Sequence, residues 1–397
     1  MTLSNYKSII LNDTLKFDLI IKGQGVLIFS NNDSQEDCYF KIYNEDKTDG
    51  LKITFTKDNV KVIKIGSSKR LNDKNNNKGL IDSKGAYYWF SIDSQNQRLY
   101  AGIGEVRLDT IIYNYNLKHS DKLFLESIVS IEISKKSKLM KQLKLLRDPV
   151  ISSIPLLVKD TNELTMNDIA SGSYLPSANL SMIAQKLYNC ISGKKFVIND
   201  DDFPDFTKAI EYSIITEGLW CNKTLKKKST EFNKDKPNIS ETYLRITIGE
   251  NNGESPGIPY VMEIWPIGHY SPIHSHSSAN AVIRVLHGKI NVDLYPYLCG
   301  EKDDVKPFAT KEFYEGDITW ISPTLNQTHK LTNLPESKDT CITIQCYMYE
   351  LEDTLHYDYF DYININGKIN KYEPDSDMDF MKFKQLIKEE WSKINKK

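Results

Sequence analysis

The stretch Gly268-His-Tyr-Ser-Pro-Ile-His274-Ser-His276 places two histidines one residue apart, and a third, His329, follows further along the chain. Residues i and i+2 of an extended strand point to the same side of a sheet, so His274 and His276 can chelate one metal ion. A third imidazole from another strand would complete a facial ligand set and leave other coordination positions open. The last third of the chain holds most of the seven histidines, namely His269, His274, His276, His287, His329 and His356. The pattern predicts a metal centre there, and the spacing does not choose among iron, copper, nickel and zinc.

The chain of 397 residues, 40% of them hydrophobic, is long enough for two or three domains with their own cores. Its formal net charge of −2 provides no long-range field that would attract nucleic acid or an anionic membrane, and we expect neither as a partner. No window reaches membrane-spanning length without charges, and the first residues do not resemble a secretory signal. The six cysteines are spread thinly without a CxxC pair, which favours reduced thiols and a cytoplasmic location.

From about residue 14 to 135 the chain consists of short β-rich runs separated by Asn, Asp and Gly. Their alternation at period two predicts an antiparallel β-sandwich over residues 1–135. The strand Tyr88-Trp89-Phe90 and the following Ala101-Gly102-Ile103-Gly104 resemble the domain named after farnesoic acid O-methyltransferase. This resemblance implies a binding or interaction module of unknown ligand or partner. The glycines are expected to serve a bulge or close strand packing.

Between residues 136 and 240 the apolar residues change to helical spacing, which predicts a helical connector. We expect helices over Leu139–Leu146, over Ala178–Ile191 with Ser177 as N-cap, and over Asp205–Ile215 behind Pro204. The lysine run Lys226–Lys228 is expected to lie in an exposed loop.

From residue 241 to 397 the chain returns to strands, among them Tyr243–Ile248, Tyr260–Trp265, Ala281–Leu286, Ile290–Tyr295, Asp317–Ile321 and Cys341–Tyr347. Phe380, Phe383, Ile387 and Trp391 follow at helical spacing with lysines opposite, which predicts an amphipathic helix packed on these strands. The sequence thus predicts a mainly β protein in three parts: an N-terminal antiparallel β-sandwich, a helical connector and a C-terminal β domain.

Two motifs of the C-terminal part resemble the signature motifs of the cupin superfamily. The first covers residues 268–288 and the second covers residues 316–333. Asn280 and Ala281 stand where a glutamate ligand is usual, so the resemblance implies three histidine ligands. It also implies a C-terminal cupin β-barrel over residues 241–397. Among cupins, the pattern is similar to the cysteine dioxygenase family.

The similarity to cysteine dioxygenases extends to the segments Tyr243-Leu-Arg245 and Asp353-Thr-Leu-His356. It implies that His274, His276 and His329 bind Fe(2+). It further implies that Arg245 holds the carboxylate of an amino-acid thiol through its planar, permanently charged fork, with Tyr243 lining the same pocket.

The Ser-His-Tyr strand of that family corresponds here to Thr343, Gln345 and Tyr347, which the resemblance implies as catalytic residues. Gln345 can donate or accept a hydrogen bond, but it cannot exchange a proton near neutral pH as a histidine would. Ala281 replaces the cysteine that forms a thioether with tyrosine in animal members, so that crosslink cannot form at this position.

The implied activity is the oxidation of a small carboxylated thiol by molecular oxygen, with L-cysteine as the expected substrate and cysteine sulfinic acid as the product. Two alternatives stay open. One is a dioxygenase for another thiol, such as a mercapto acid or a peptide with an N-terminal cysteine. The other is a catalytically divergent cupin that acts as a binding or assembly module, which the changes at Gln345 and Ala281 motivate.

Overall fold

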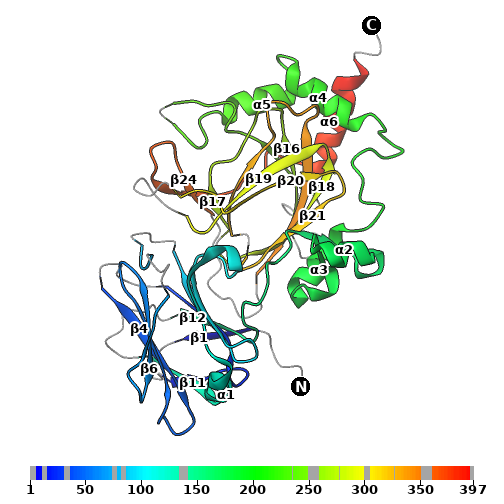
Figure 1. Cartoon of the computed structure of the whole chain (residues 1–397). Coiled ribbons are helices and arrows are strands. Elements are labelled where there is room, and N and C mark those ends of the chain that lie inside the picture. Colours follow the sequence, from blue (N-terminus) through cyan, green and yellow to red (C-terminus); the bar gives the residue numbers. More distant parts are fainter. Residues whose placement is uncertain are drawn as a thin grey trace. The chain divides into compact units, whose positions relative to one another are not determined.

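Figure 1 shows the computed structural model of the chain, which is mainly β, as predicted. The structure describes residues 6–10, 16–30, 36–73, 78–81, 86–133, 142–234, 236–248, 259–276, 278–298, 305–325, 327–349 and 360–393. The chain divides into two compact units, Met1–Ser153 and Ile154–Lys397. Within the described ranges, none of the helices has the length and hydropathy needed to cross a membrane.

The first unit consists of two six-stranded antiparallel sheets. One contains β1 (Tyr6–Ile10), β12 (Gln142–Leu146), β3 (Gln24–Phe29), β8 (Tyr88–Asp93), β9 (Arg98–Ile103) and β10 (Ile111–Asn116), in that spatial order. The other contains β2 (Lys16–Asp18), β11 (Ile128–Ile133), β4 (Cys38–Asn44), β5 (Gly50–Phe55), β6 (Val60–Ile65) and β7 (Arg70–Leu71), and helix α1 (Lys122–Glu126) precedes β11. Phe29 of one sheet contacts Phe40 and Phe55 of the other at ring-centroid distances of 5.6 and 5.0 Å. The two sheets therefore pack face to face as the predicted antiparallel β-sandwich.

Strand β12 corrects one helix prediction. Residues 142–146, which we predicted as helical, form this strand and pair with both β1 and β3. Leu143 and Leu145 are buried, whereas Lys144 between them is half-buried, which is the alternation of a strand. The first residues of the predicted helix, 139–141, lie outside the described residues. The unit boundary therefore divides the predicted connector, since β12 belongs to the first unit and the described helices from residue 154 onward belong to the second.

Gly102 of the first unit is required by the packing of Trp89. The two residues are directly opposite each other on β9 and β8, and a Cβ atom at position 102 would lie 2.2 Å from atoms of the indole ring. The indole nitrogen donates a hydrogen bond to the carbonyl of Glu105 at 3.0 Å, which fixes the ring in place. This confirms close strand packing as the role of Gly102, and it indicates a structural role.

We expect Gly102→Ala to lower the free energy of unfolding of the first unit by about 1–3 kcal/mol, because overpacking displaces the indole or the strand. Urea unfolding followed by circular dichroism measures this loss. Gly193→Ala is the matched control, since no atom lies within 4 Å of the Cβ it would add. Equal effects of the two substitutions would contradict the packing argument.

The second unit contains an eight-stranded and a six-stranded sheet. The eight-stranded sheet has the order β14 (Tyr174–Pro176), β13 (Leu157–Lys159), β21 (Ile318–Ile321), β18 (Asn280–His287), β23 (Cys341–Met348), β16 (Tyr260–Trp265), β15 (Leu244–Ile248) and β26 (Met378–Asp379). The six-stranded sheet has the order β20 (Ala309–Tyr314), β19 (Lys289–Tyr295), β22 (Thr328–Thr332), β17 (His274–Ser275), β24 (Phe360–Ile363) and β25 (Ile369–Tyr372). Trp265 and Val285 of the first sheet form one buried cluster with Val292 and Leu331 of the second. The facing sides of the two sheets thus share a core.

Helices complete the second unit: α2 (Met166–Ser171), α3 (Met182–Ile191), α4 (Phe206–Ile215), α5 (Trp220–Lys228) and α6 (Phe380–Ser392). Helix α4 matches the predicted helix behind Pro204. Phe383 and Ile387 of α6 are fully buried and share a core cluster with Phe206 of α4 and Ile246 of β15. This confirms that the amphipathic helix packs on the strands.

Two helix boundaries differ from the prediction. Helix α3 begins after Ser181, whose hydroxyl oxygen accepts a hydrogen bond from the backbone N–H of Ala184 at 3.2 Å, so Ser177 is not its N-cap. Lys226–Lys228 form the last turn of α5 and not a loop. Lysines are favoured at this end of a helix, where the backbone carbonyls carry partial negative charge.

Candidate metal centre

Strand pairing brings the three predicted histidines together. Strand β17 lies between β22 and β24, and His274 is directly opposite His329 in the register of β17 and β22. The ring centroid of His276 lies 4.9 Å from that of His274 and 4.8 Å from that of His329. The candidate ligand nitrogens of the three side chains all lie within 4.8 Å of one another.

Burial sets the protonation state of two of the three histidines, His274 and His276. Burial lowers the pKa of His274 to about 4 and lowers the pKa of His276 well below its ordinary value. The Nδ1 atom of His274 lies 3.0 Å from the carbonyl oxygen of Pro272, which can only accept a hydrogen bond. Nδ1 therefore carries the proton, and Nε2 keeps a free lone pair. Neutral imidazoles with a free lone pair are the form in which histidine binds a metal ion.

The cluster fits a divalent transition-metal ion. The Nε2 atoms of His276 and His329 are 3.0 Å apart. Two nitrogens that each lie about 2.1 Å from one ion, at a right angle, would be about 3 Å apart. A set of three imidazoles favours iron, copper, nickel or zinc over calcium or magnesium, which prefer oxygen ligands. These three residues could therefore hold one such ion, and the donor set alone does not select iron.

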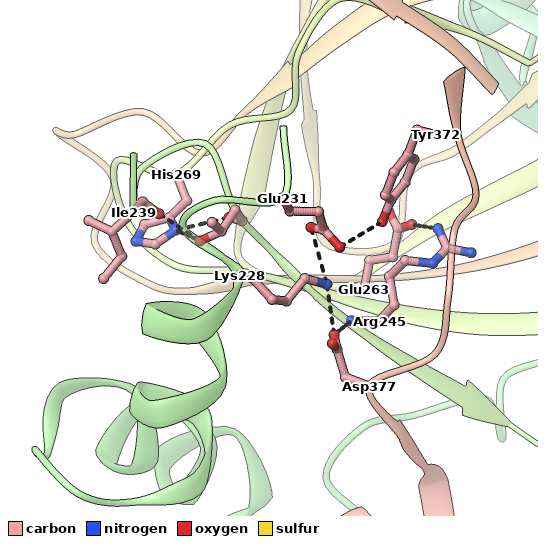
Figure 2. A network of polar contacts seen from close by, with 9 residues as sticks. Lys228, Glu231, Ile239, Arg245, Glu263, His269, Tyr372 and Asp377 are labelled. Carbon is pink, nitrogen blue, oxygen red and sulfur yellow. Dashed lines mark hydrogen bonds and ion pairs between the residues drawn. The ribbon is translucent and has the colours of Figure 1, made fainter. Parts of the chain in front are cut away.

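Four polar side chains extend from the histidine cluster along the inner side of the eight-stranded sheet. The hydroxyl of Tyr347 donates to Oε1 of Gln345, and Nε2 of Gln345 donates to Oε2 of Glu263. Nη1 of Arg245 donates to Oε1 of Glu263 at 2.5 Å, and both side chains are almost completely buried (Figure 2). The rings of Tyr347 and His276 stack at a centroid distance of 6.1 Å, so this chain of hydrogen bonds ends beside the cluster.

Burial determines the charge states along this chain. It raises the pKa of Glu263, and the neighbouring Arg245 guanidinium opposes that rise by favouring the carboxylate. It also raises the pKa of Tyr347, so the hydroxyl remains protonated at neutral pH and can donate to Gln345. Sequence reasoning missed Glu263. The available signal was a carboxylate in the otherwise apolar run Tyr260–Trp265, since a buried charge needs a partner.

A second polar network holds the backbone of Arg245 through Asp377 (Figure 2). Oδ2 of Asp377 accepts hydrogen bonds from the backbone N–H of Arg245 at 2.7 Å and from Nζ of Lys228 at 3.0 Å. Nζ of Lys228 also lies 3.6 Å from Oε2 of Glu231, whose Oε1 accepts from the hydroxyl of Tyr372 at 3.4 Å. Lys228 is only 8% exposed, which corrects its prediction as an exposed residue. The end of α5 and the residue before β26 thus fix the position of β15.

A cavity of about 50 Å³ connects the histidine cluster with the polar chain. One water molecule needs about 10–15 Å³ on this scale, so the cavity offers room for roughly four. Its lining includes the three histidines, the four residues of the polar chain, and apolar side chains of both sheets such as Val285, Val292 and Leu294. The arrangement suits a small ligand with one end at the histidines.

The other two predicted site residues line the same cavity. The ring of Tyr243 stacks on Trp265 at a centroid distance of 4.2 Å, and Tyr243 is buried. The buried hydroxyl oxygen of Thr343 has no hydrogen-bond partner among the described residues. The structure therefore brings every predicted site residue to one cavity, although it does not test the role assigned to each.

Three further sequence observations have different outcomes. Ala281, which the resemblance aligns with a crosslinking cysteine, is directly opposite Tyr347 in the register of β18 and β23. Nδ1 of His269 lies 2.9 Å from the carbonyl oxygen of Thr242, and this histidine is not part of the cluster. The segment Asp353–His356 lies outside the described residues.

No family model matches the chain. Cupin domains are among the solved structures that it resembles. The cupin domain of Cnp3 from Schizosaccharomyces pombe is 12% identical, with 27% of this chain and 65% of that chain covered, at a TM-score of 0.21. The cupin domain of an XRE family transcriptional regulator from Enterobacter cloacae is 13% identical, with 27% and 97% covered, at a TM-score of 0.21.

An enzyme is also among these structures. The L-ribose isomerase of Acinetobacter sp. DL28 is 16% identical, with 27% of this chain and 56% of that chain covered, at a TM-score of 0.20. The chain thus covers little more than half of that enzyme. Identities and TM-scores this low do not establish a common family or activity.

Proposed function

We propose that this chain is a metal-dependent dioxygenase that oxidises a small thiol to a sulfinic acid. The thiol R–SH and one molecule of O2 give R–SO2H, so sulfur loses four electrons, O2 gains them, and both oxygen atoms enter the product. The observation that carries the proposal is the convergence of three histidines on one small buried cavity. The proposed partners are therefore a small thiol and molecular oxygen, and the proposed metal is Fe(2+).

The proposal assigns metal binding to the three histidines and a hydrogen-bonding role to Tyr347 and Gln345. His274, His276 and His329 would hold the ion, which when bound lowers the pKa of a coordinated thiol and supplies a binding position for oxygen. Tyr347 places a protonated hydroxyl beside His276. The hydrogen bond from Tyr347 to Gln345 orients that hydroxyl, and Gln345 cannot accept its proton. Because its one proton is donated to Gln345, Tyr347 offers the lone pairs of its hydroxyl oxygen as a fixed hydrogen-bond acceptor toward the reacting atoms.

Oxygen uptake by the Fe(2+)-loaded chain tests the proposal. We expect one O2 to be consumed for each thiol that disappears, with a product that is heavier by two oxygen atoms in mass spectrometry. His276→Ala should abolish this uptake, and His119→Ala, an exposed histidine of the first unit, should leave it unchanged. A protein that binds iron stoichiometrically and consumes no oxygen with any small thiol would contradict the proposal.

A second candidate function is a binding module without turnover, and the contact between Tyr347 and Gln345 favours it. A histidine at position 345 could exchange a proton with the tyrosine, whereas the glutamine cannot. Thiol binding to the iron-loaded chain without oxygen uptake would be the result expected for this function.

L-Cysteine as the substrate, with its carboxylate on Arg245, remains a prediction from the resemblance. The Arg245 guanidinium is paired with Glu263 in the structure. This pair affects which thiols the cavity can take.

A further inference from the structure

The register of two neighbouring strands places Arg245 beside Glu263. The two residues are directly opposite each other in the register of β15 and β16, so their side chains share one face of the sheet. Nη1 of Arg245 and Oε1 of Glu263 are 2.5 Å apart, and the two side chains are 6% and 5% exposed. An ion pair this deeply buried has lost its water, so each charge depends on the other for compensation.

Glu263 is held on both of its carboxylate oxygens. Oε1 accepts from Arg245 and Oε2 accepts from Nε2 of Gln345. Gln345 is itself fixed, because its Oε1 accepts from the hydroxyl of Tyr347. The carboxylate cannot turn away from Arg245 without breaking its bond to Gln345, so it stays on the guanidinium as an internal anion.

The described side chains around the cavity offer no second cation that could bind a ligand carboxylate at the end away from the histidines. Among the described residues that line it, Arg245 is the one with a positive side chain, while Glu263 and Asp317 are acidic. A ligand carboxylate at Arg245 would therefore have to share the guanidinium with Glu263 at close range, and like charges at such distances repel strongly in a buried site.

We infer that Glu263 compensates the charge on Arg245 that a substrate carboxylate would need, and that the cavity selects small thiols without a carboxylate. This inference rests on the proposed function and replaces its expected substrate class. The group next to the thiol is then neutral or cationic, for example a hydroxyl or an amine. Glu263 is a specificity-determining residue in this scheme, and it takes no part in oxygen chemistry.

Calorimetric titration of the anaerobic, Fe(2+)-loaded chain tests the inference with two matched pairs of thiols. Cysteamine differs from cysteine only by the carboxylate, and 3-mercaptopropanol has a hydroxymethyl group where 3-mercaptopropionate has the carboxylate. We expect the thiol without a carboxylate to bind at least about tenfold more tightly in each pair, because the other leaves a carboxylate poorly compensated. Tighter binding of cysteine and 3-mercaptopropionate to the unaltered chain would overturn the inference.

Glu263→Gln keeps the size of the side chain and removes the negative charge that compensates Arg245. In this variant we expect the preference in both pairs to reverse toward the carboxylated thiol. Glu217→Gln, at an exposed glutamate of the same unit, should keep the preference of the unaltered chain. If Glu263→Gln left the ratio of the two affinities in each pair unchanged, the inference would also be overturned. If the variant does not fold, the preference of the unaltered chain tests the inference by itself.

These outcomes separate the inference from the function on which it rests. Thiols that bind and are oxidised, but with a preference for a carboxylate, would refute the inference and leave the dioxygenase in place. A chain that binds iron but none of the four thiols would refute both.

Discussion

His276→Ala will lose stoichiometric metal binding, with a fall in affinity of more than about 100-fold. Loss of a residue that merely orients a metal ligand already costs about 10–100-fold, and His276 is placed to be a ligand itself. Its Nε2 lies 3.0 Å from that of His329, and no other described histidine, cysteine or carboxylate joins this group to replace it. Elemental analysis after dialysis against Fe(2+), repeated with Zn(2+), measures the effect and shows which metal the site retains.

The matched control is His269→Ala, which removes a neighbouring imidazole outside the cluster. His269 contacts the carbonyl of Thr242, so its loss should leave the metal content unchanged. If the chain with alanine at position 276 kept its metal, the histidine cluster would not be the metal centre.

Glu263→Ala will lower the free energy of unfolding of the second unit by about 3–5 kcal/mol, because it leaves the guanidinium of Arg245 buried without its counter-charge. It also removes the acceptor of the Gln345 amide. Urea unfolding followed by tryptophan fluorescence is a suitable measurement. Of the five tryptophans, Trp220, Trp265, Trp320 and Trp391 belong to the second unit, so the signal reports mainly on it.

The double variant Arg245→Met, Glu263→Leu provides the control for this prediction. Replacement of a whole buried ion pair by apolar side chains is often neutral or stabilising, so most of the lost stability should return. Glu217→Ala, which removes the partner of an exposed lysine, should have no measurable effect. A small effect of Glu263→Ala would mean that Arg245 reaches water or another acceptor.

The strands and the amphipathic helix could be predicted because their side chains alternate between core and solvent with the correct period. The helical expectation over 139–146 is wrong for residues 142–146. The spacing of the leucines is compatible with both a helix and a strand, and pairing with the neighbouring strands β1 and β3 selects the strand. The position of Lys228 could not be read from a run of lysines. Its burial depends on Asp377, which lies 149 residues further along the chain.

The histidine cluster could be predicted because two of its members are local in sequence and the third belongs to a recognisable motif. Arg245 was predicted as a site residue in the same way, but its pairing with Glu263 was not predicted. The sequence places a guanidinium near the histidines, while only the register of β15 and β16 shows that Glu263 already occupies it. Partners across a sheet follow from strand pairing, which one sequence does not contain.

The contact between Asp377 and the backbone of Arg245 has a consequence for synthesis on the ribosome. The two residues are separated by 132 positions, which take about ten seconds to translate. Until Asp377 and β26 have emerged, β15 is the last strand of its sheet, and its outer backbone groups are open to pairing with another nascent chain. During this interval the outer edge of β15 is open to misassembly, and slower translation before residue 377 would lengthen the exposure.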